Sequence, residues 1–148
     1  MGIRSDLVLG LCSLLDAEGA CTWTPTGVVD VLADPAPVFR TIYPDTPDIA
    51  AALTAYATGG DEPTLSGSVL MLQVRTRGSL DDPGAAEDLD DAISQALMGN
   101  YPIVLDTGCR VSVIIRVSSS PIGRDAKGRM ELSTNYRIMV HDPGPHRG

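Results

Sequence analysis

The segment from Ser68 to Leu97 constrains the fold of this chain more than any other part of the sequence. Its first half predicts a β-strand, because apolar residues recur at every second position, at Leu70, Leu72 and Val74. Its second half predicts an α-helix that begins at Pro83, with Asp81 or Asp82 as its N-cap. We therefore expect a strand that leads directly into a helix.

The predicted helix is amphipathic, because its apolar residues fall on one stripe at helical spacing. The stripe consists of Ala86, Leu89, Ile93 and Ala96 or Leu97, and the polar residues away from it are Glu87, Asp88, Asp91 and Gln95. A strand with one apolar side and a helix with one apolar stripe can cover each other. The sequence thus predicts a two-layer core that the remaining segments complete.

Before this segment, the sequence predicts one helix and three short extended pieces. The helix spans Ile3–Asp16, where the apolar residues share one face. Val28–Leu32 is a short extended piece inside a loop rich in glycine and proline, and Val38–Ile42 is a β-leaning run. Ile49–Ala57 is ambiguous, because its alanines favour a helix whereas the short distance to the next glycine pair favours a strand. From the residues alone we prefer the strand.

After the Ser68–Leu97 segment, two stretches alternate between apolar and polar residues as strands do. In Arg110–Ser118, one side carries Val111, Val113, Ile115 and Val117, and the other carries Arg110, Ser112, Ile114 and Arg116. In Leu132–Val140, one side carries Leu132, Tyr136, Ile138 and Val140. The polar stretch between them, Ser119–Arg129, is interpreted as a long hairpin loop.

The order helix, strands, helix, strands predicts a single α+β domain. We expect a mostly antiparallel sheet of about four to five strands, with the helices packed on one face. Residues 1–142 form this domain in our interpretation, and residues 143–148 form a mobile C-terminal tail.

The net charge of −8 excludes a protein that holds nucleic acid through its phosphates, because a negative field repels phosphate. The charge is uneven. Residues 1–74 carry nine acids and two bases (−7), whereas residues 75–148 carry ten acids and nine bases (−1). An acidic first half and a nearly neutral, arginine-bearing second half have the asymmetry that a head-to-tail ring would use.

The sequence predicts a protein that is made in a cytoplasm and does not enter a membrane. No window approaches the roughly 20 apolar residues of a membrane span, and the apolar N-terminal run lacks the flanks of a secretory signal. The three cysteines have no Cys-x-x-Cys spacing and are expected to be reduced. With only two histidines, both near the C-terminus, a zinc site is not expected.

One cluster could carry chemistry: the acids Asp81, Asp82, Glu87, Asp88, Asp90 and Asp91 at the start of the predicted helix. Paired carboxylates can hold magnesium or divide acid and base roles, which would suit a small metal-dependent hydrolase. Acids at this position also stabilise the positive end of the helix dipole. No phosphate loop or nucleophile motif accompanies them, so we prefer a solvated helix face and predict no enzyme, metal or cofactor.

The basic residues of the second half are candidates for contacts between proteins. Arg75 and Arg77 end the predicted strand on the same side, and further cations follow in the last third of the chain. The candidate interface residues are Arg75, Arg77, Arg116, Arg124, Lys127, Arg129 and Arg137. Two simpler interpretations stay open: a solubilising hairpin tip, and pairing of Arg75 and Arg77 with Asp81 and Asp82 of the same chain.

Several segments together resemble the tail terminator proteins of long-tailed phages of actinobacteria, which are often labelled minor capsid proteins. The most specific part is the strand end Gln-Val-Arg-x-Arg-Gly, followed by an acidic turn and the run Asp-Asp-Ala-Ile. The resembling segments are Phe39–Ala50, Leu53–Tyr56, Leu72–Gly78, Asp90–Ile93 and Ser118–Arg129, and the similarity spans residues 1–142. The resemblance also implies a strand at Ile49–Ala57.

The resemblance implies a structural virion protein that forms a ring, typically of six copies, on the head-proximal end of the tail tube. Its expected partners are other copies of itself, the major tail tube protein and a head-completion or neck protein. Genome DNA would pass through the bore without specific binding. The alternatives are another neck protein, such as a head-closure protein or an adaptor, and the hydrolase named above. A tail-tube protein fits less well, since long self-pairing strands are not evident.

Overall fold

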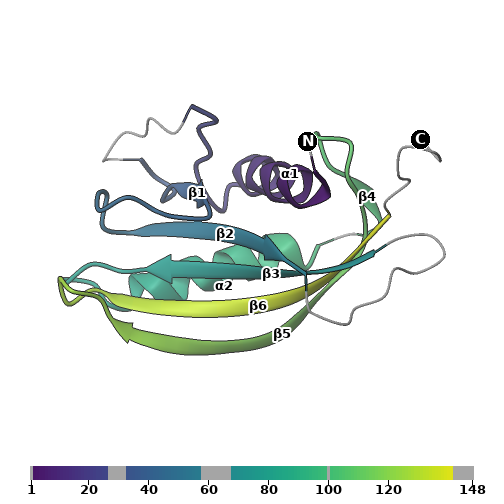
Figure 1. Cartoon of the computed structure of the whole chain (residues 1–148). Helices are drawn as coiled ribbons and strands as arrows, with labels where there is room; N and C mark the ends of the chain where they lie inside the picture. Colours follow the sequence, from purple (N-terminus) through teal and green to yellow (C-terminus); the bar gives the residue numbers. More distant parts are fainter. Residues whose placement is uncertain (1, 27–32, 58–67, 100, 142–148) are drawn as a thin grey trace.

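The computed structural model describes residues 2–26, 33–57, 68–99 and 101–141 of the chain (Figure 1). Within these residues the chain forms two helices and six strands. In chain order they are α1 (Ile3–Ala17), β1 (Val38–Arg40), β2 (Ala50–Tyr56), β3 (Ser68–Arg77), α2 (Ala85–Leu97), β4 (Ile103–Val104), β5 (Arg110–Arg124) and β6 (Met130–His141).

The strands form one mixed sheet in the order β1-β2-β3-β6-β5-β4. β1 runs parallel to β2, and every other neighbouring pair is antiparallel. At the centre, Val74 of β3 lies opposite Leu53 of β2 on one side and Thr134 of β6 on the other. The prediction of four to five strands was too low, because the two-residue strand β4 and the parallel pairing of β1 have no periodic signal in the sequence.

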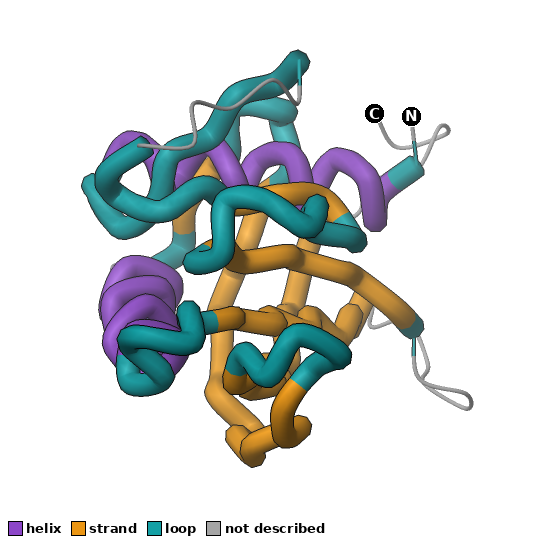
Figure 2. The backbone as a smooth tube through the Cα atoms, turned by 90° about the vertical axis from the view of Figure 1, so that its left-hand side faces the viewer, coloured by secondary structure: helices purple, strands orange, loops and turns teal. Residues whose placement is uncertain are grey.

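Both helices pack against the same hydrophobic core, while the sheet curls (Figure 2). The core includes Leu7 and Leu11 of α1, Ile93 of α2 and the predicted strand residues Leu72 and Val74, all of them fully buried. The helix predicted at Ile3–Asp16 and the strand preferred at Ile49–Ala57 are therefore confirmed as α1 and β2. The α+β class with the helices on one face is confirmed as well.

The start of α2 differs from the prediction. The residue before the helix is Gly84, and no side chain caps the first turn. Asp82 instead belongs to a tight turn, in which its backbone carbonyl accepts hydrogen bonds from the amides of Ser79 (3.2 Å) and Ala85 (3.2 Å). The first amide of the helix, that of Ala85, thus bonds to a backbone carbonyl, and Gly84 occupies the N-cap position predicted for Asp81 or Asp82.

The predicted loop at Ser119–Arg129 is wrong. β5 continues through the serine run and Pro121 as far as Arg124, and only a short turn separates it from β6. The turn closes with the amide of Gly128 donating to the carbonyl of Asp125 at 2.9 Å. Polar residues and a proline suit an edge strand, which needs backbone pairing on one side only. β5 thus has 15 residues. The argument against a tail-tube protein, that long strands are not evident, therefore no longer holds.

The alternation predicted for Arg110–Ser118 also fails after its first residues. The register of β5 against β6 shifts between Val111 and Val113 and at two later points. As a result Val111 and Ile114 are buried, whereas Val113, Ile115 and Val117 are exposed. A β-bulge reverses which residues face the core, and sequence periodicity alone does not reveal it.

Two predictions lie outside the described residues: the extended piece at Val28–Leu32 and the C-terminal tail at 143–148. Within the described residues, no helix is long and apolar enough to cross a membrane.

Candidate assembly surfaces

Two of the predicted interface arginines lie inside the molecule. Arg77, at the end of β3, is 3 % exposed, and its guanidinium lies 4.4 Å from the ring centre of Tyr43. It donates hydrogen bonds to the backbone carbonyls of Asp48 (2.7 Å), Pro44 (2.7 Å) and Pro47 (2.8 Å). Its donors therefore hold the segment 44–48 against the end of the sheet, and they do not reach Asp81 or Asp82.

Arg129, at the β5–β6 turn, is 5 % exposed and binds the same segment through carboxylates. Its guanidinium pairs with Asp45 at 3.0 Å, Asp48 at 2.9 Å and Asp125 at 2.8 Å. Hydrogen bonds from Lys127, and then from Arg129, hold the pKa of Asp45 below its ordinary value. The two buried arginines thus join segments that are distant in sequence into one structural cluster.

Arg75 is partly exposed and pairs with Glu131 of β6 at 3.1 Å. The hydroxyl of Tyr43 donates a hydrogen bond to the same carboxylate. Burial, followed by the hydrogen bond to Glu131, raises the pKa of the Tyr43 hydroxyl. The side chain of Arg75 is committed to a contact within the chain, although part of it remains accessible.

The acidic stretch around α2 is not uniformly solvated as predicted. Asp90 is 3 % exposed and faces the sheet. Its carboxylate accepts a hydrogen bond from the hydroxyl of Thr134 at 2.8 Å and lies 3.3 Å from the guanidinium of Arg116. One turn later, the hydroxyl of Tyr136 donates to Ser94 Oγ at 2.9 Å. These polar contacts fix α2 on β5 and β6. The side chains of Arg116 and Asp90 are therefore used for contacts within the chain.

The other five acids of this stretch, Asp81, Asp82, Glu87, Asp88 and Asp91, are exposed. Across the described residues, no group of three or more His, Cys, Asp or Glu side chains is placed to hold a metal ion. These acids therefore do not form the metal site that a metal-dependent hydrolase would need.

Arg124, Lys127 and Arg137, the remaining predicted interface residues, are exposed. Arg124 and Lys127 lie at the β5–β6 turn, where Arg124 donates to the carbonyl of Gly128 at 2.8 Å and Lys127 pairs with Asp45. Arg137 lies on β6 opposite Ile115 of β5. These three side chains keep accessible positive charge at the molecular surface.

An exposed apolar area surrounds Arg137, and sequence periodicity did not predict it. We define the β5 surface as the exposed side chains of Arg110, Val113, Ile115, Val117, Arg137 and Met139. Val113 lies opposite Met139 and Ile115 opposite Arg137, so these four side chains share the sheet face away from Ile114 and Ile138, which are buried in the core. One signal was available: Arg110–Ser118 carries apolar residues on both sides of its alternation, more than a single core face needs.

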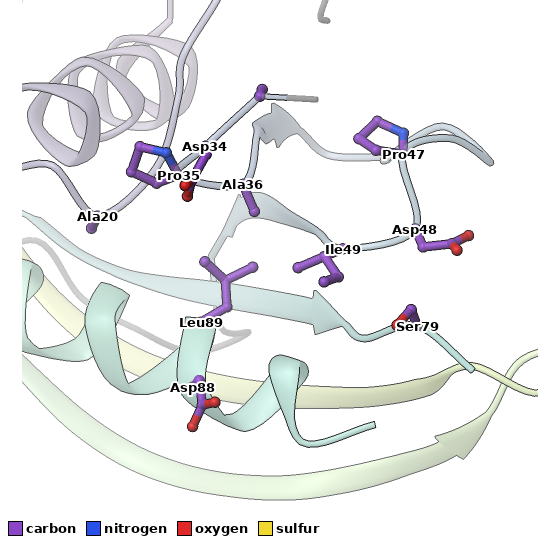
Figure 3. Close-up of a pocket in the computed structure, with 11 residues that line it drawn as sticks. Ala20, Asp34, Pro35, Ala36, Pro47, Asp48, Ile49, Ser79, Asp88 and Leu89 are labelled. Carbon is purple, nitrogen blue, oxygen red and sulfur yellow. The ribbon is translucent and has the colours of Figure 1, made fainter. Parts of the chain in front are cut away.

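A pocket of about 550 Å³ opens between the start of α2 and the segments that precede β1 and β2 (Figure 3). Leu89 and Ile49 point toward each other in its apolar floor. Asp34, Asp48 and Asp88 also line it. We call this site the acidic pocket, since three of the residues that line it are aspartates.

Comparisons with known proteins identify the family of this chain. A family model described as bacteriophage tail terminator protein matches residues 14–141. The chain belongs to the phage tail terminator family. The predicted resemblance is confirmed at this level, and the family is a structural phage tail family. No curated protein sequence matches the chain.

Two solved structures are similar to this member of the family. A chain of the virion of a native gene transfer agent particle is 16 % identical, with a TM-score of 0.57, over 71 % of this chain and 78 % of that chain. A second solved chain is 17 % identical, with a TM-score of 0.50, over 95 % of this chain and 94 % of its own length. At these identities the likeness establishes a shared fold, and the first example shows this fold inside a virion.

Proposed function

We propose that this chain forms a ring on the head-proximal end of the phage tail tube, where it ends tube polymerisation and provides the docking surface for the head. The observation that carries this proposal is the match of the tail terminator family model over residues 14–141. The likeness to a virion chain supports it, because the same fold occurs in an assembled particle.

In this proposal the chain acts through its surfaces, without enzyme activity or a cofactor. It is synthesised in the host cytoplasm and becomes part of the virion, and its ring has six copies. Its partners are the major tail tube protein on one side and a head-completion or neck protein on the other. The predicted actinobacterial host stays part of the proposal.

The negative charge of the protein supports a ring through which DNA passes. The chain carries −8 overall, and a bore lined by acids or neutral polar groups lets a polyanion slide without binding. The alternative of a head-closure protein or an adaptor differs only in the neighbours of the ring, so the decisive observation is the phenotype of particles that lack the chain.

The test is to block translation of this chain during infection and to image the products by electron microscopy. Overlong tails without heads, beside filled heads without tails, are expected if the chain ends tube growth. Tails of normal length beside leaking heads would instead assign the chain to the head side of the neck. Intact infectious virions would refute a structural role in the tail.

A further inference from the structure

The free side of β5 is not covered by any part of the chain that the structure describes. β4 pairs with β5 only at Arg110 and Val111, so beyond these residues β6 is the sole described partner of the strand. Every side chain from Ile115 to Ile122 is exposed, including Ile115, Val117 and Ile122 themselves. Long edge strands with apolar side chains are usually covered or blunted in proteins, because their free backbone groups pair readily with another chain.

The charge of the β5 surface indicates what kind of partner covers it. Arg110 and Arg137 are exposed, and neither forms an ion pair with any residue in the described ranges. The surface therefore combines apolar side chains with positive charge that no described residue pairs with. A matching partner presents apolar groups together with carboxylates.

The acidic pocket of the same chain has this complementary chemistry. Its floor contains Leu89 and Ile49, and Asp34 and Asp88 line it without an ion pair to any described residue. Asp48 also lines it but already binds Arg129. One chain thus carries both an apolar–basic surface and an apolar–acidic surface.

The two surfaces lie on opposite faces of the sheet. The pocket is on the helix-covered face, between α2 and residues 33–36 and 47–49, whereas Val113, Ile115, Arg137 and Met139 of the β5 surface are on the face away from the core. They cannot meet within one copy of this fold. Complementary surfaces on different sides of a subunit are what a head-to-tail contact between identical copies requires.

We propose that the β5 surface of one copy docks on the acidic pocket of the next copy, with Arg110 and Arg137 facing Asp34 and Asp88. This inference rests on the proposed ring and specifies which surfaces form its subunit contact. Each copy gives its β5 surface to one neighbour and its pocket to the other, so the contact repeats around the ring.

Reciprocal charge reversal tests this contact. The β5 variant is Arg110→Glu with Arg137→Glu, and the pocket variant is Asp34→Lys with Asp88→Lys. In either variant alone, like charges face each other at every contact, whereas a mixture places opposite charges at contacts between unlike copies. Arg4→Glu is the control, because Arg4 is an exposed arginine of α1 outside both surfaces. Circular dichroism and urea unfolding first establish that each variant folds.

Each version is supplied from a plasmid during infection by a phage in which translation of the chain is blocked. We expect wild-type chain and Arg4→Glu to restore virions, each double variant alone to lower the titre about tenfold or more, and the two variants together to restore it. Titres at the wild-type level with either variant alone, or no rescue by the mixture of folded variants, would overturn the proposed contact while leaving the terminator role in place. Failure of the wild-type chain to restore virions with normal tails would instead refute the proposed function and, with it, the contact that rests on it.

Discussion

Replacing Thr134 by valine tests whether the buried contact between α2 and β6 stabilises the fold. Thr134 is fully buried, and its hydroxyl donates to the buried carboxylate of Asp90 at 2.8 Å. Valine has nearly the same shape, so the change leaves the packing intact. It removes two hydrogen bonds, the one to Asp90 and a 2.9 Å bond with the hydroxyl of Ser119, an exposed residue that can bond to water instead. A hydrogen bond to a charged group contributes roughly 1.5–3 kcal/mol, so we expect the free energy of unfolding to fall by about 2 kcal/mol at pH 7.

The loss of unfolding free energy in Thr134→Val should depend on pH in a defined direction. Burial raises the pKa of Asp90 above its ordinary value of 3.8, against the opposing effects of Thr134 and Arg116. A raised pKa means that the folded state binds this proton more tightly than the unfolded state, so its contribution to stability decreases as the pH rises from 3.8 through the folded-state pKa. Without the Thr134 hydroxyl this pKa rises further, so the loss should be largest at neutral pH and smaller where Asp90 is protonated.

Thr76→Val is the matched control. Thr76 is equally buried on the neighbouring strand β3, but its hydroxyl has no hydrogen-bond partner among the residues that the structure describes. Removing an unsatisfied buried hydroxyl is expected to leave stability unchanged or to increase it. Urea unfolding at pH 7 and at pH values near 4 measures both variants. Equal losses for Thr134→Val and Thr76→Val, or a Thr134→Val loss that does not change with pH, would refute this account of Asp90.

Three further predictions concern other parts of the fold. Gly10→Ala should lower the free energy of unfolding by about 1–3 kcal/mol, because the new Cβ would lie 2.7 Å from Leu105 Cβ; a gain, as expected for an exposed helical glycine, would contradict the close packing of α1. Lys127→Met should bring the pKa of Asp45 back toward 3.8, and NMR titration of its carboxyl group would reveal this. Since that pKa is lowered in the folded state, the associated stability is present above pH 3.8 and is lost as the pH falls through the lowered value. Burial raises the pKa values of Cys12 and Cys21 to about 12, so neither thiol should react with a disulfide reagent at pH 8 until urea unfolds the protein; fast reaction of Cys12 in the native state would show that α1 opens.

The sequence predicted those elements whose apolar pattern matches the period of the structure. α1, β3 and α2 follow this rule, and the buried residues Leu70, Leu72, Ile93 and Leu97 were all identified. β4 was missed because two residues carry no period. The β-leaning run predicted at Val38–Ile42 contains β1, but its parallel pairing with β2 was not predicted, because pairing direction leaves no local signal. The inner and outer faces of β5 were misassigned because bulges shift its register.

The candidate surfaces were predicted less well, because charge in the sequence does not reveal burial. No feature of the sequence distinguishes Arg77 and Arg129, which are buried, from Arg137, which is exposed. In the structure, carbonyls and carboxylates of residues 44–48 bind the first two. Likewise Asp90 differs from Asp91 only in which side of α2 it occupies. The acidic pocket required five separate stretches of the chain to meet, and no pattern in any one of them predicts this.

The position of β6 in the sheet has a consequence for synthesis on the ribosome. β6 is the last described strand, yet it lies between β3 and β5, and Leu70 meets its partner Ile138 only after almost the whole chain has been made. Until then the nascent hairpin of β2 and β3 presents one unpaired side, and α2 lacks Thr134 and Tyr136. Because domains emerge N-terminus first, the core of this one can close only when its final segment leaves the exit tunnel. A chain released before β6 should therefore be a target for chaperones and proteases, so that only full-length copies reach the tail.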